Sequence, residues 1–206
     1  GEGRVEEKSL SLYATWLAPH GFYVDLVGRS AWLANDFELL DTSDRQVRGE
    51  TISTNGLGLS VETGKLTPIW QNEEHLIYFE PQVQYSFDRQ SGNTFKASNG
   101  VRVKVSPFNS ERLRTGVRFG YERQGVGTAV NIYGKASYVK EFDGDTDFTA
   151  NGIPMTETFG SDRWLYGIGA AVKINQANAI HLDVERSAGG RIKEPWAVRG
   201  GWRWEF

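Results

Sequence analysis

The sequence has no cysteine and only three histidines in 206 residues. A chain without cysteine cannot be held by disulfides, and it has no thiolate to bind a metal or act as a nucleophile. The lack of cysteine also suits a chain that must stay unfolded while it crosses an oxidising compartment. Because the three histidines are not clustered either, the sequence predicts no metal site.

Long apolar runs are also missing. No segment reaches the ~18 residues that a membrane-spanning helix needs, mean hydropathy is -0.47, and 24% of residues are charged. If the chain enters a bilayer, it must do so as a closed β-barrel, because only helices and barrels satisfy every backbone group there. The net charge of -3 is too small to indicate nucleic-acid binding. The first residues do not form a signal peptide, so any export signal is expected upstream or has been removed.

Glycine and aromatic residues are plentiful, and the aromatics gather in the last twelve residues. Strand side chains alternate between two faces. One face of this segment would carry Trp196, Val198, Gly200, Trp202, Trp204 and Phe206. Aromatics on a lipid-facing strand are typical of the interfacial girdles of outer-membrane barrels. The segment is therefore predicted to be the closing strand of a transmembrane antiparallel up-and-down β-barrel.

Eight earlier segments alternate in the same way. The predicted strands are 9–17, 22–35, 50–66, 75–88, 112–123, 129–142, 162–174 and 179–187. The expected connections alternate between short turns (18–21, 68–74, 124–127, 175–178) and long loops (36–49, 89–109 with a strand extension at 101–105, 143–161, 188–194). This alternation is the pattern of bacterial outer-membrane barrels. A water-soluble sandwich is disfavoured, because it would not place aromatics at both ends of so many strands. Pro81 interrupts a predicted strand and predicts a bulge or a local distortion there.

The number of strands leads to a further expectation. Nine strands with a periplasmic C-terminus make an odd number, whereas single-chain bacterial barrels have an even number. Nine open strands would also leave on the order of ten unpaired backbone groups at each edge, at several kcal/mol apiece in hydrocarbon. We therefore expect residues 1–206 to be one barrel domain that is incomplete at its N-terminal side.

Several motifs carry a resemblance to a known family. They are Leu12 to Trp16, Gly21 to Asp25, Phe79 to Gln82, Ser98 to Gly100, Lys135 to Ser137, Glu141 to Gly144 and the closing segment. In this order they resemble the C-terminal translocator domain of the classical (type Va) autotransporters. The resemblance implies a twelve-stranded barrel, of which about nine strands are here, with a helix threading its lumen. It also implies type V secretion: the barrel carries an upstream passenger across the outer membrane and anchors it at the cell surface.

The end of the chain also resembles the signal that the barrel-assembly machinery reads. The matching residues are Arg199, Gly201, Trp204 and Phe206. An edge strand can be recognised through its backbone hydrogen bonds, with alternate side chains giving specificity. The alternative is that these aromatics only form the girdle. The expected partners are this machinery, outer-membrane lipid, and the chain's own passenger and linker helix. One hypothesis is that the chain is a folding intermediate bound to the machinery.

Alternation also assigns side chains to the two faces of the wall. The predicted lumen-facing residues are Asp25, Arg29, Glu62, Glu80, Arg114, Arg118, Lys135, Glu141, Asp183 and Glu185. The predicted lipid-facing or girdle residues are Trp16, Phe22, Phe79, Tyr121, Trp164, Tyr166, Trp196 and Trp202. The lumenal charges either pair with one another or, for Arg114, Arg118 and Glu141, contact the threaded segment. Inward glycines either leave room for that segment or relieve strand curvature.

Two other functional classes stay open. An outer-membrane hydrolase would need a nucleophile beside His181, which is predicted to face inward near Asp183 and Glu185, and no serine is placed for this. A simple diffusion porin is the other alternative. Some members of the family cut their own linker, but nothing in this sequence supports assigning such residues. No enzymatic activity and no cofactor are predicted.

Overall fold

The fold is taken from a computed structural model that describes residues 1–40, 44–158, 160–175, 177–190 and 195–204. Within these ranges the chain is almost entirely β-structure, and the one helical element is the 3-10 turn η1 (Pro19–Gly21). No described helix is long and apolar enough to cross a membrane.

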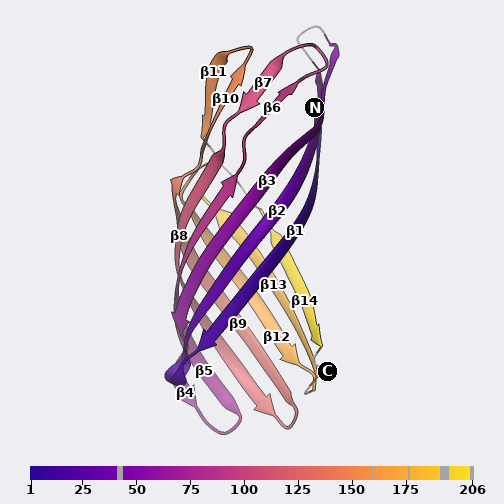
Figure 1. The fold of residues 1–206 in the computed structure, drawn as a ribbon. Helices are drawn as coiled ribbons and strands as arrows, with labels where there is room; N and C mark the ends of the chain where they lie inside the picture. The colour runs from indigo at the N-terminus through magenta and orange to yellow at the C-terminus, as the bar shows by residue number, and fades with distance from the viewer. Residues whose placement is uncertain (41–43, 159, 176, 191–194, 205–206) are drawn as a thin grey trace.

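One large antiparallel sheet makes up most of the molecule (Figure 1). Its strands are β1 (Glu2–Leu17), β2 (Phe22–Leu40), β3 (Gln46–Lys65), β5 (His75–Gln90), β8 (Phe108–Gly125), β9 (Thr128–Asp143), β12 (Arg163–Lys173), β13 (Asn178–Ala188) and β14 (Ala197–Trp204), in that spatial order, with β4 (Thr67–Gln71) also paired to β5. Each strand is thus paired with its neighbours in the sequence, as in an up-and-down barrel. The turns near η1 and after β4, β8 and β12 lie at one end of the sheet, the short-turn end; the opposite end is the long-loop end.

A second, smaller sheet stands at the long-loop end (Figure 1). It consists of β6 (Asn93–Lys96), β7 (Arg102–Val105), β10 (Asp145–Ala150) and β11 (Ile153–Thr158), in the order β11-β10-β7-β6. Its two hairpins come from the connections between β5 and β8 and between β9 and β12. The ring of Phe95 on β6 meets that of Phe37 on β2 at 5.8 Å, so the small sheet rests on the wall of the large one.

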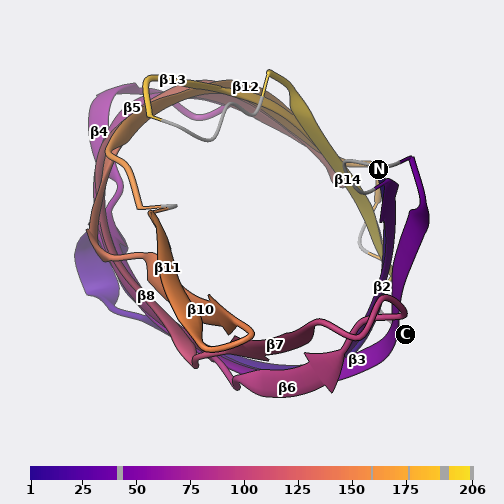
Figure 2. The same ribbon diagram turned by 90° about the horizontal axis from the view of Figure 1, so that it is seen from above.

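The large sheet curves into a ring around a central lumen (Figure 2). Its two edge strands, β1 and β14, come round to the same side of that ring. Each of them pairs with only one neighbour, and no ladder joins them in the described chain. Both therefore present a row of backbone N–H and C=O groups that the sheet itself does not satisfy.

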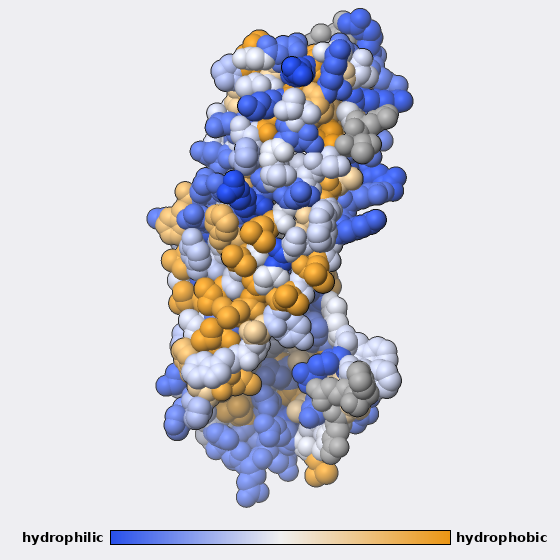
Figure 3. Space-filling view, viewed as in Figure 1, coloured by the Kyte–Doolittle hydropathy of each residue, from blue (hydrophilic) through white to orange (hydrophobic). Residues whose placement is uncertain are grey.

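The sheet is apolar on its outer face and polar on its inner face, which is the reverse of a water-soluble barrel. Outward side chains are apolar and exposed, such as Leu12 (73% exposed) and Ile168 (68%). Inward side chains are polar and buried, such as Glu80 (4%) and Gln82 (6%). Figure 3 shows the outer apolar side chains as a band at mid-height, with hydrophilic ends above and below. This is the distribution expected of a wall whose outside contacts lipid and whose inside contacts water.

All nine predicted strands are present, but several predicted loops are wrong. β1 begins at Glu2, and β2 and β3 extend through most of the segment expected to be a loop at 36–49. The predicted loops 89–109 and 143–161 contain the four strands of the small sheet, of which β7 matches the strand extension expected at 101–105. β4 (Thr67–Gln71) overlaps the predicted turn 68–74. Antiparallel pairing needs only backbone groups, so it continues where the side chains become polar and the alternation fades.

Pro81 does not cause a bulge in its own strand. Its register with β8 is unbroken, because it lies opposite Val117 between regular neighbours. On the opposite edge of β5, the pairing with β3 ends at Gln82 and the pairing with β4 begins at Phe79, so Pro81 lies where this ladder is interrupted. The missing N–H of proline therefore coincides with the interruption between β3 and β4.

Candidate functional site in the lumen

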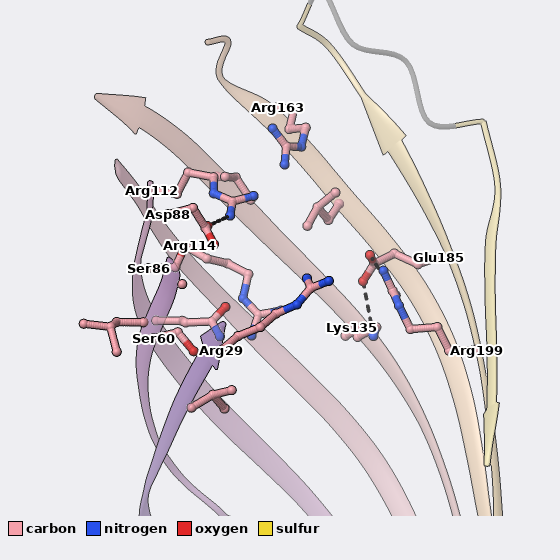
Figure 4. A pocket seen from close by; sticks show the side chains of 16 residues that line it. Arg29, Ser60, Ser86, Asp88, Arg112, Arg114, Lys135, Arg163, Glu185 and Arg199 are labelled. Carbon is pink, nitrogen blue, oxygen red and sulfur yellow. Dashed lines mark hydrogen bonds and ion pairs between the residues drawn. The ribbon is translucent and has the colours of Figure 1, made fainter. Parts of the chain in front are cut away.

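The lumen contains a cavity of about 480 Å³ that extends from β2 to β14 (Figure 4). Its charged lining consists of Arg29, Asp88, Arg112, Arg114, Lys135, Arg163, Glu185 and Arg199. Six cations thus face two carboxylates across the cavity, although other carboxylates stand just behind the lining.

One cluster of polar side chains begins on β2, at the short-turn side of this cavity. The Tyr23 hydroxyl lies 3.0 Å from Glu62 Oε1 on β3 and 3.0 Å from Glu80 Oε1 on β5. Gln82 Nε2 donates to Glu80 Oε1 at 2.7 Å and to the Tyr23 hydroxyl at 3.0 Å. Arg114 on β8 pairs with Glu62 at 2.6 Å. These contacts connect four strands through inward side chains alone.

The cluster continues around the wall through Arg118 on β8. Arg118 Nη1 lies 3.5 Å from Glu80 Oε2, and its guanidinium stacks 4.6 Å above the ring of Tyr133 on β9. The Tyr133 hydroxyl donates to Asp183 Oδ2 on β13 at 2.8 Å. A cation over an aromatic face adds an attraction of roughly 0.5–2 kcal/mol when it is partly desolvated.

Lys135 and Arg199 complete the series. Lys135 Nζ lies 3.0 Å from Asp183 Oδ1 and 3.2 Å from Glu185 Oε2. Arg199 on β14 lies 3.3 Å from the other oxygen of Glu185. We call the whole set the inner belt: Tyr23, Glu62, Glu80, Gln82, Arg114, Arg118, Tyr133, Lys135, Asp183, Glu185 and Arg199. It joins β2, β3, β5, β8, β9, β13 and β14 by side chains, across the direction of the strands.

Glycines explain how the belt passes strands that contribute no charge. At Gly169 and Gly167 on β12, an added Cβ would stand 2.4 Å from the ring of Tyr133 and 2.6 Å from Lys135 Cε. Both side chains therefore cross β12 over a glycine and reach β13. Tyr78 crosses Gly120 on β8 in the same way, with its Cζ 2.4 Å from that Cβ position, and reaches Asn131 on β9. Inward glycines thus make room for side chains of the wall itself.

Several other lumenal charges pair beside the belt, toward the long loops. Arg112 binds Asp88, and Arg29 binds Glu7. Glu141 accepts a hydrogen bond from the Ser110 hydroxyl at 2.6 Å and lies 4.0 Å from Arg112 Nε. Arg163, in contrast, has no carboxylate partner in the described part of the chain. Of the six cations that line the cavity, it is the one for which the described residues offer no carboxylate, so it can meet an anion that enters.

A second cavity, of about 540 Å³, opens on the short-turn side of the belt. Its charged lining is Asp25, Glu62, Glu80 and Arg118, so carboxylates predominate here. Asp25 Oδ1 is buried without a hydrogen-bond partner, as is Arg118 Nε. The lumen therefore changes from acidic to basic along its axis.

All ten residues predicted to face the lumen lie on the inner face, and seven of them belong to the belt. Asp25, Arg29 and Glu141 lie inside but outside it. Sequence reasoning missed the role of Tyr23, Gln82 and Tyr133 in the belt and of Arg112 beside it. The alternating pattern puts Tyr23 and Gln82 on the polar face of their strands, but it does not indicate which side chains they meet on neighbouring strands.

The predicted girdle residues lie on the outer face, and seven of the eight have more than a third of their surface exposed. Trp16 and Phe22 meet edge to face at 6.0 Å beside the short-turn end, and Trp164 stacks on Tyr166 at 6.2 Å towards the long-loop end. Trp202 donates to Asn178 Oδ1 at 3.0 Å. Tyr121 is less exposed, because its hydroxyl lies 2.7 Å from His75 Nδ1. The other exposed members are Phe79 and Trp196.

The four residues of the predicted assembly signal have different surroundings. Arg199 is part of the belt, and Trp204 is exposed on the outside (65%). Gly201 faces inward, where an added Cβ would stand 2.2 Å from the His181 ring. Phe206 lies outside the described residues. Gly201 therefore has a packing role in addition to any role in recognition.

In the described part of the chain, His181 has no hydrogen bond to a carboxylate. Asp183, its nearest carboxylate in the alternating pattern, accepts from Tyr133 and Lys135 instead. Among the described residues, no group of three histidine, aspartate or glutamate side chains is placed to hold a metal ion.

Comparisons with known proteins agree on one family. A family model described as Autotransporter beta-domain matches residues 1–185. A probable autotransporter of Escherichia coli, YcgV, is 29% identical to this chain; the match covers all of this chain and 21% of YcgV. It is 30% identical to 22% of the pertactin autotransporter of Bordetella parapertussis. Against the crystal structure of the beta domain of the Bordetella autotransporter BrkA, the TM-score is 0.82 at 26% identity, covering 99% of this chain and 75% of that one. The chain therefore spans about a fifth of the length of the curated relatives it matches.

Proposed function

The chain belongs to the autotransporter beta-domain family, and on that basis we propose that it carries an upstream passenger across the outer membrane and anchors it at the cell surface. The observation that supports this most directly is the reversed wall: apolar outside, polar inside, around a lumen with two cavities. In this proposal the short-turn end and the C-terminus are periplasmic, and the long-loop end with its small sheet is extracellular.

The lumen holds the segment that links the barrel to the passenger. Six cations line the larger cavity and Arg163 has no carboxylate partner among the described residues, so a carboxylate of the linker segment binds there. Carboxylates predominate in the cavity at the short-turn side, and Asp25 Oδ1 has no partner, so a cationic or amide group of the linker lies there. Arg114 and Arg118 hold the wall through the belt and present their remaining N–H groups to this segment. No catalytic step and no cofactor are assigned to these residues.

The test uses the absence of cysteine. In the whole gene product we would place one cysteine at Arg163 on the inner face, or at Ile168 on the outer face of the same strand, and a second cysteine at successive positions upstream of Gly1. Oxidation should join the Arg163 position, and not the Ile168 control, to a short run of upstream positions. Joining at neither position, or equally at both, would contradict a linker in the lumen.

Transport is measured separately, as the amount of passenger that added protease removes from intact cells. The porin alternative predicts steady ion conductance by the purified whole protein, unchanged when the linker is deleted. The present proposal predicts conductance only after that deletion, because the linker fills the lumen.

We further propose that the barrel-assembly machinery recognises the final strand, and that lipid-embedded partners or further strands cover the open edges of β1 and β14. Replacing Trp204 with alanine should lower the amount of protein assembled in the outer membrane, because the strand then loses an exposed aromatic contact. Trp196→Ala, at the other end of the same segment, is the matched control. Equal loss in the two variants would indicate a girdle role without recognition.

A further inference from the structure

The outer wall has a groove that the girdle and the lumen do not explain. Two adjoining depressions, of about 560 and 610 Å³, lie on β8, β9, β12 and β13. They share the residues Phe119, Gly134, Ile168 and Val184. These positions are neighbours across the strands, since Phe119 pairs with Gly134 and Gly134 with Ile168. The two depressions therefore form one groove that crosses the apolar band.

Gly134 creates the groove. It points outward between two large apolar side chains, and a Cβ added there would meet nothing closer than the Gly167 oxygen at 4.0 Å. A side chain would fit at this position without disturbing the wall. The glycine therefore leaves an open slot, unlike the inward glycines, which neighbouring side chains cover.

The groove is apolar along its length and basic at one end. Its outward side chains are aliphatic or aromatic except Arg186, which lines the end nearest the long loops together with Trp196. The Arg186 guanidinium stacks 5.7 Å from the Trp196 ring. No carboxylate pairs with Arg186 in the part of the chain that the structure describes. A cation at the edge of an apolar band, without a counter-charge from the protein, favours an anion from the surroundings.

We propose that this groove binds a phosphate-bearing anionic lipid of the leaflet at the long-loop end. One acyl chain lies in the slot over Gly134, and the phosphate lies against Arg186. Guanidinium groups match phosphate geometry through paired N–H donors, which fits Arg186 better than a lysine. The proposal rests on the membrane location of the proposed function, but not on passenger transport.

The test is lipid retention by the purified whole protein, measured by native mass spectrometry. Phosphatidylglycerol and phosphatidylcholine with the same acyl chains are supplied at equal concentration. We expect retention of phosphatidylglycerol to exceed that of phosphatidylcholine about tenfold, equivalent to roughly 1.4 kcal/mol. R186Q should retain the two lipids about equally, because the contact between the guanidinium and the lipid charge is lost. G134L should abolish retention of both lipids, because its side chain fills the slot.

Two matched variants control for general effects. G28L places leucine at an outward glycine of β2 that also has room, with its nearest contact at 3.7 Å to Leu59. K140Q removes an outward cation that stacks on Phe142 and does not line the groove. Both should retain the lipid preference of the unchanged protein. Every variant is first checked for folding by its heat-modifiable gel migration, and R186M, which also removes the charge, replaces R186Q if the latter does not fold.

The proposal is overturned if the unchanged protein retains both lipids equally, or if G134L and R186Q keep the preference. Passenger exposure on intact cells is recorded for the same variants. Failure of passenger exposure in the unchanged protein would reject the proposed function, while lipid retention would still be read independently.

Discussion

Single inward glycines are the residues on which the lumen wall most clearly depends. Gly169 is the best example, because the Tyr133 ring lies where its side chain would be. The sequence could show that this glycine faces inward. The sequence could not show that Tyr133 of β9 lies across this glycine, because that contact depends on the register between β9 and β12.

Replacing Gly169 with valine should therefore destabilise the barrel. The new side chain displaces the Tyr133 ring and breaks its 2.8 Å hydrogen bond to Asp183, at a cost of about 1–3 kcal/mol. The measurement is the urea midpoint of the heat-modifiable band. Gly28→Val, at an outward glycine with room, is the control and should lower the midpoint far less. Similar midpoints for the two variants would show that Tyr133 moves aside without cost.

Asp162 gives a pH-dependent prediction outside the membrane-spanning segments. The Tyr138 hydroxyl donates to this carboxylate at 2.7 Å and the Glu141 N–H at 3.2 Å, and these bonds lower the pKa of Asp162 below 3.8. Since the pKa is lower in the folded state, the stabilisation is fully present above about pH 4 and is lost as pH falls through the folded value.

Tyr138→Phe should raise the pKa of Asp162 towards its ordinary value. The carboxyl titration can be followed by NMR of the labelled aspartate. An unchanged pKa in Tyr138→Phe would mean that the backbone N–H of Glu141 is enough to hold it. Asp162→Asn should remove the low-pH transition and leave the rest of the pH profile as it is.

At the scale of elements, Lys135 ties β9 to β13 over the intervening β12. Its ammonium lies between Asp183 and Glu185, and all three side chains are at most 16% exposed. Lys135→Met should cost about 2–4 kcal/mol, because Asp183 is left without its cation in a partly buried site and Glu185 keeps only Arg199. The double variant Lys135→Met, Asp183→Asn should recover part of that loss. Unfolding midpoints that simply add would show that the pair is not coupled.

The elements themselves were largely predictable from the sequence. Period-two alternation located nine strands and their faces, because lipid outside and water inside impose it wherever the wall crosses the apolar band. The same reasoning failed at the long-loop end. There β2 continues to Leu40, β3 begins at Gln46, and β10 and β11 form, although apolar alternation in these segments is short or weak. Backbone pairing outside the membrane leaves little trace in side-chain type.

The candidate site was predictable only in part, for the same reason. Charged residues such as Glu80 and Arg118 could be assigned to the lumen individually, but their pairing follows from strand register and could not. The belt roles of Tyr23 and Tyr133 were missed because their hydrogen bonds reach other strands, and the register between strands cannot be read from the sequence. The groove at Gly134 was not predicted either, since an outward glycine acquires meaning only from its neighbours on β8 and β12.

For the whole molecule, the open edges of β1 and β14 matter most. Unpaired backbone groups in hydrocarbon cost several kcal/mol each, so two open edges are incompatible with a stable isolated wall in lipid. Residues 1–206 refolded alone in detergent should therefore run on cold gels as an unfolded band. The whole gene product should run as a compact band that heating shifts. A compact, protease-resistant band from residues 1–206 would show that β1 and β14 can pair with each other.

The crossings over glycine also have a temporal consequence. The hydrogen bond from Tyr133 on β9 to Asp183 on β13 cannot form in a two-stranded hairpin, because it requires β9, β12 and β13 together. Each such bond therefore forms only after the third strand has paired, and it then stabilises the pairing of the first two strands. If the wall is pulled out of a membrane by its C-terminus, the force should rise in steps where β13 and then β9 leave, and not evenly at every hairpin.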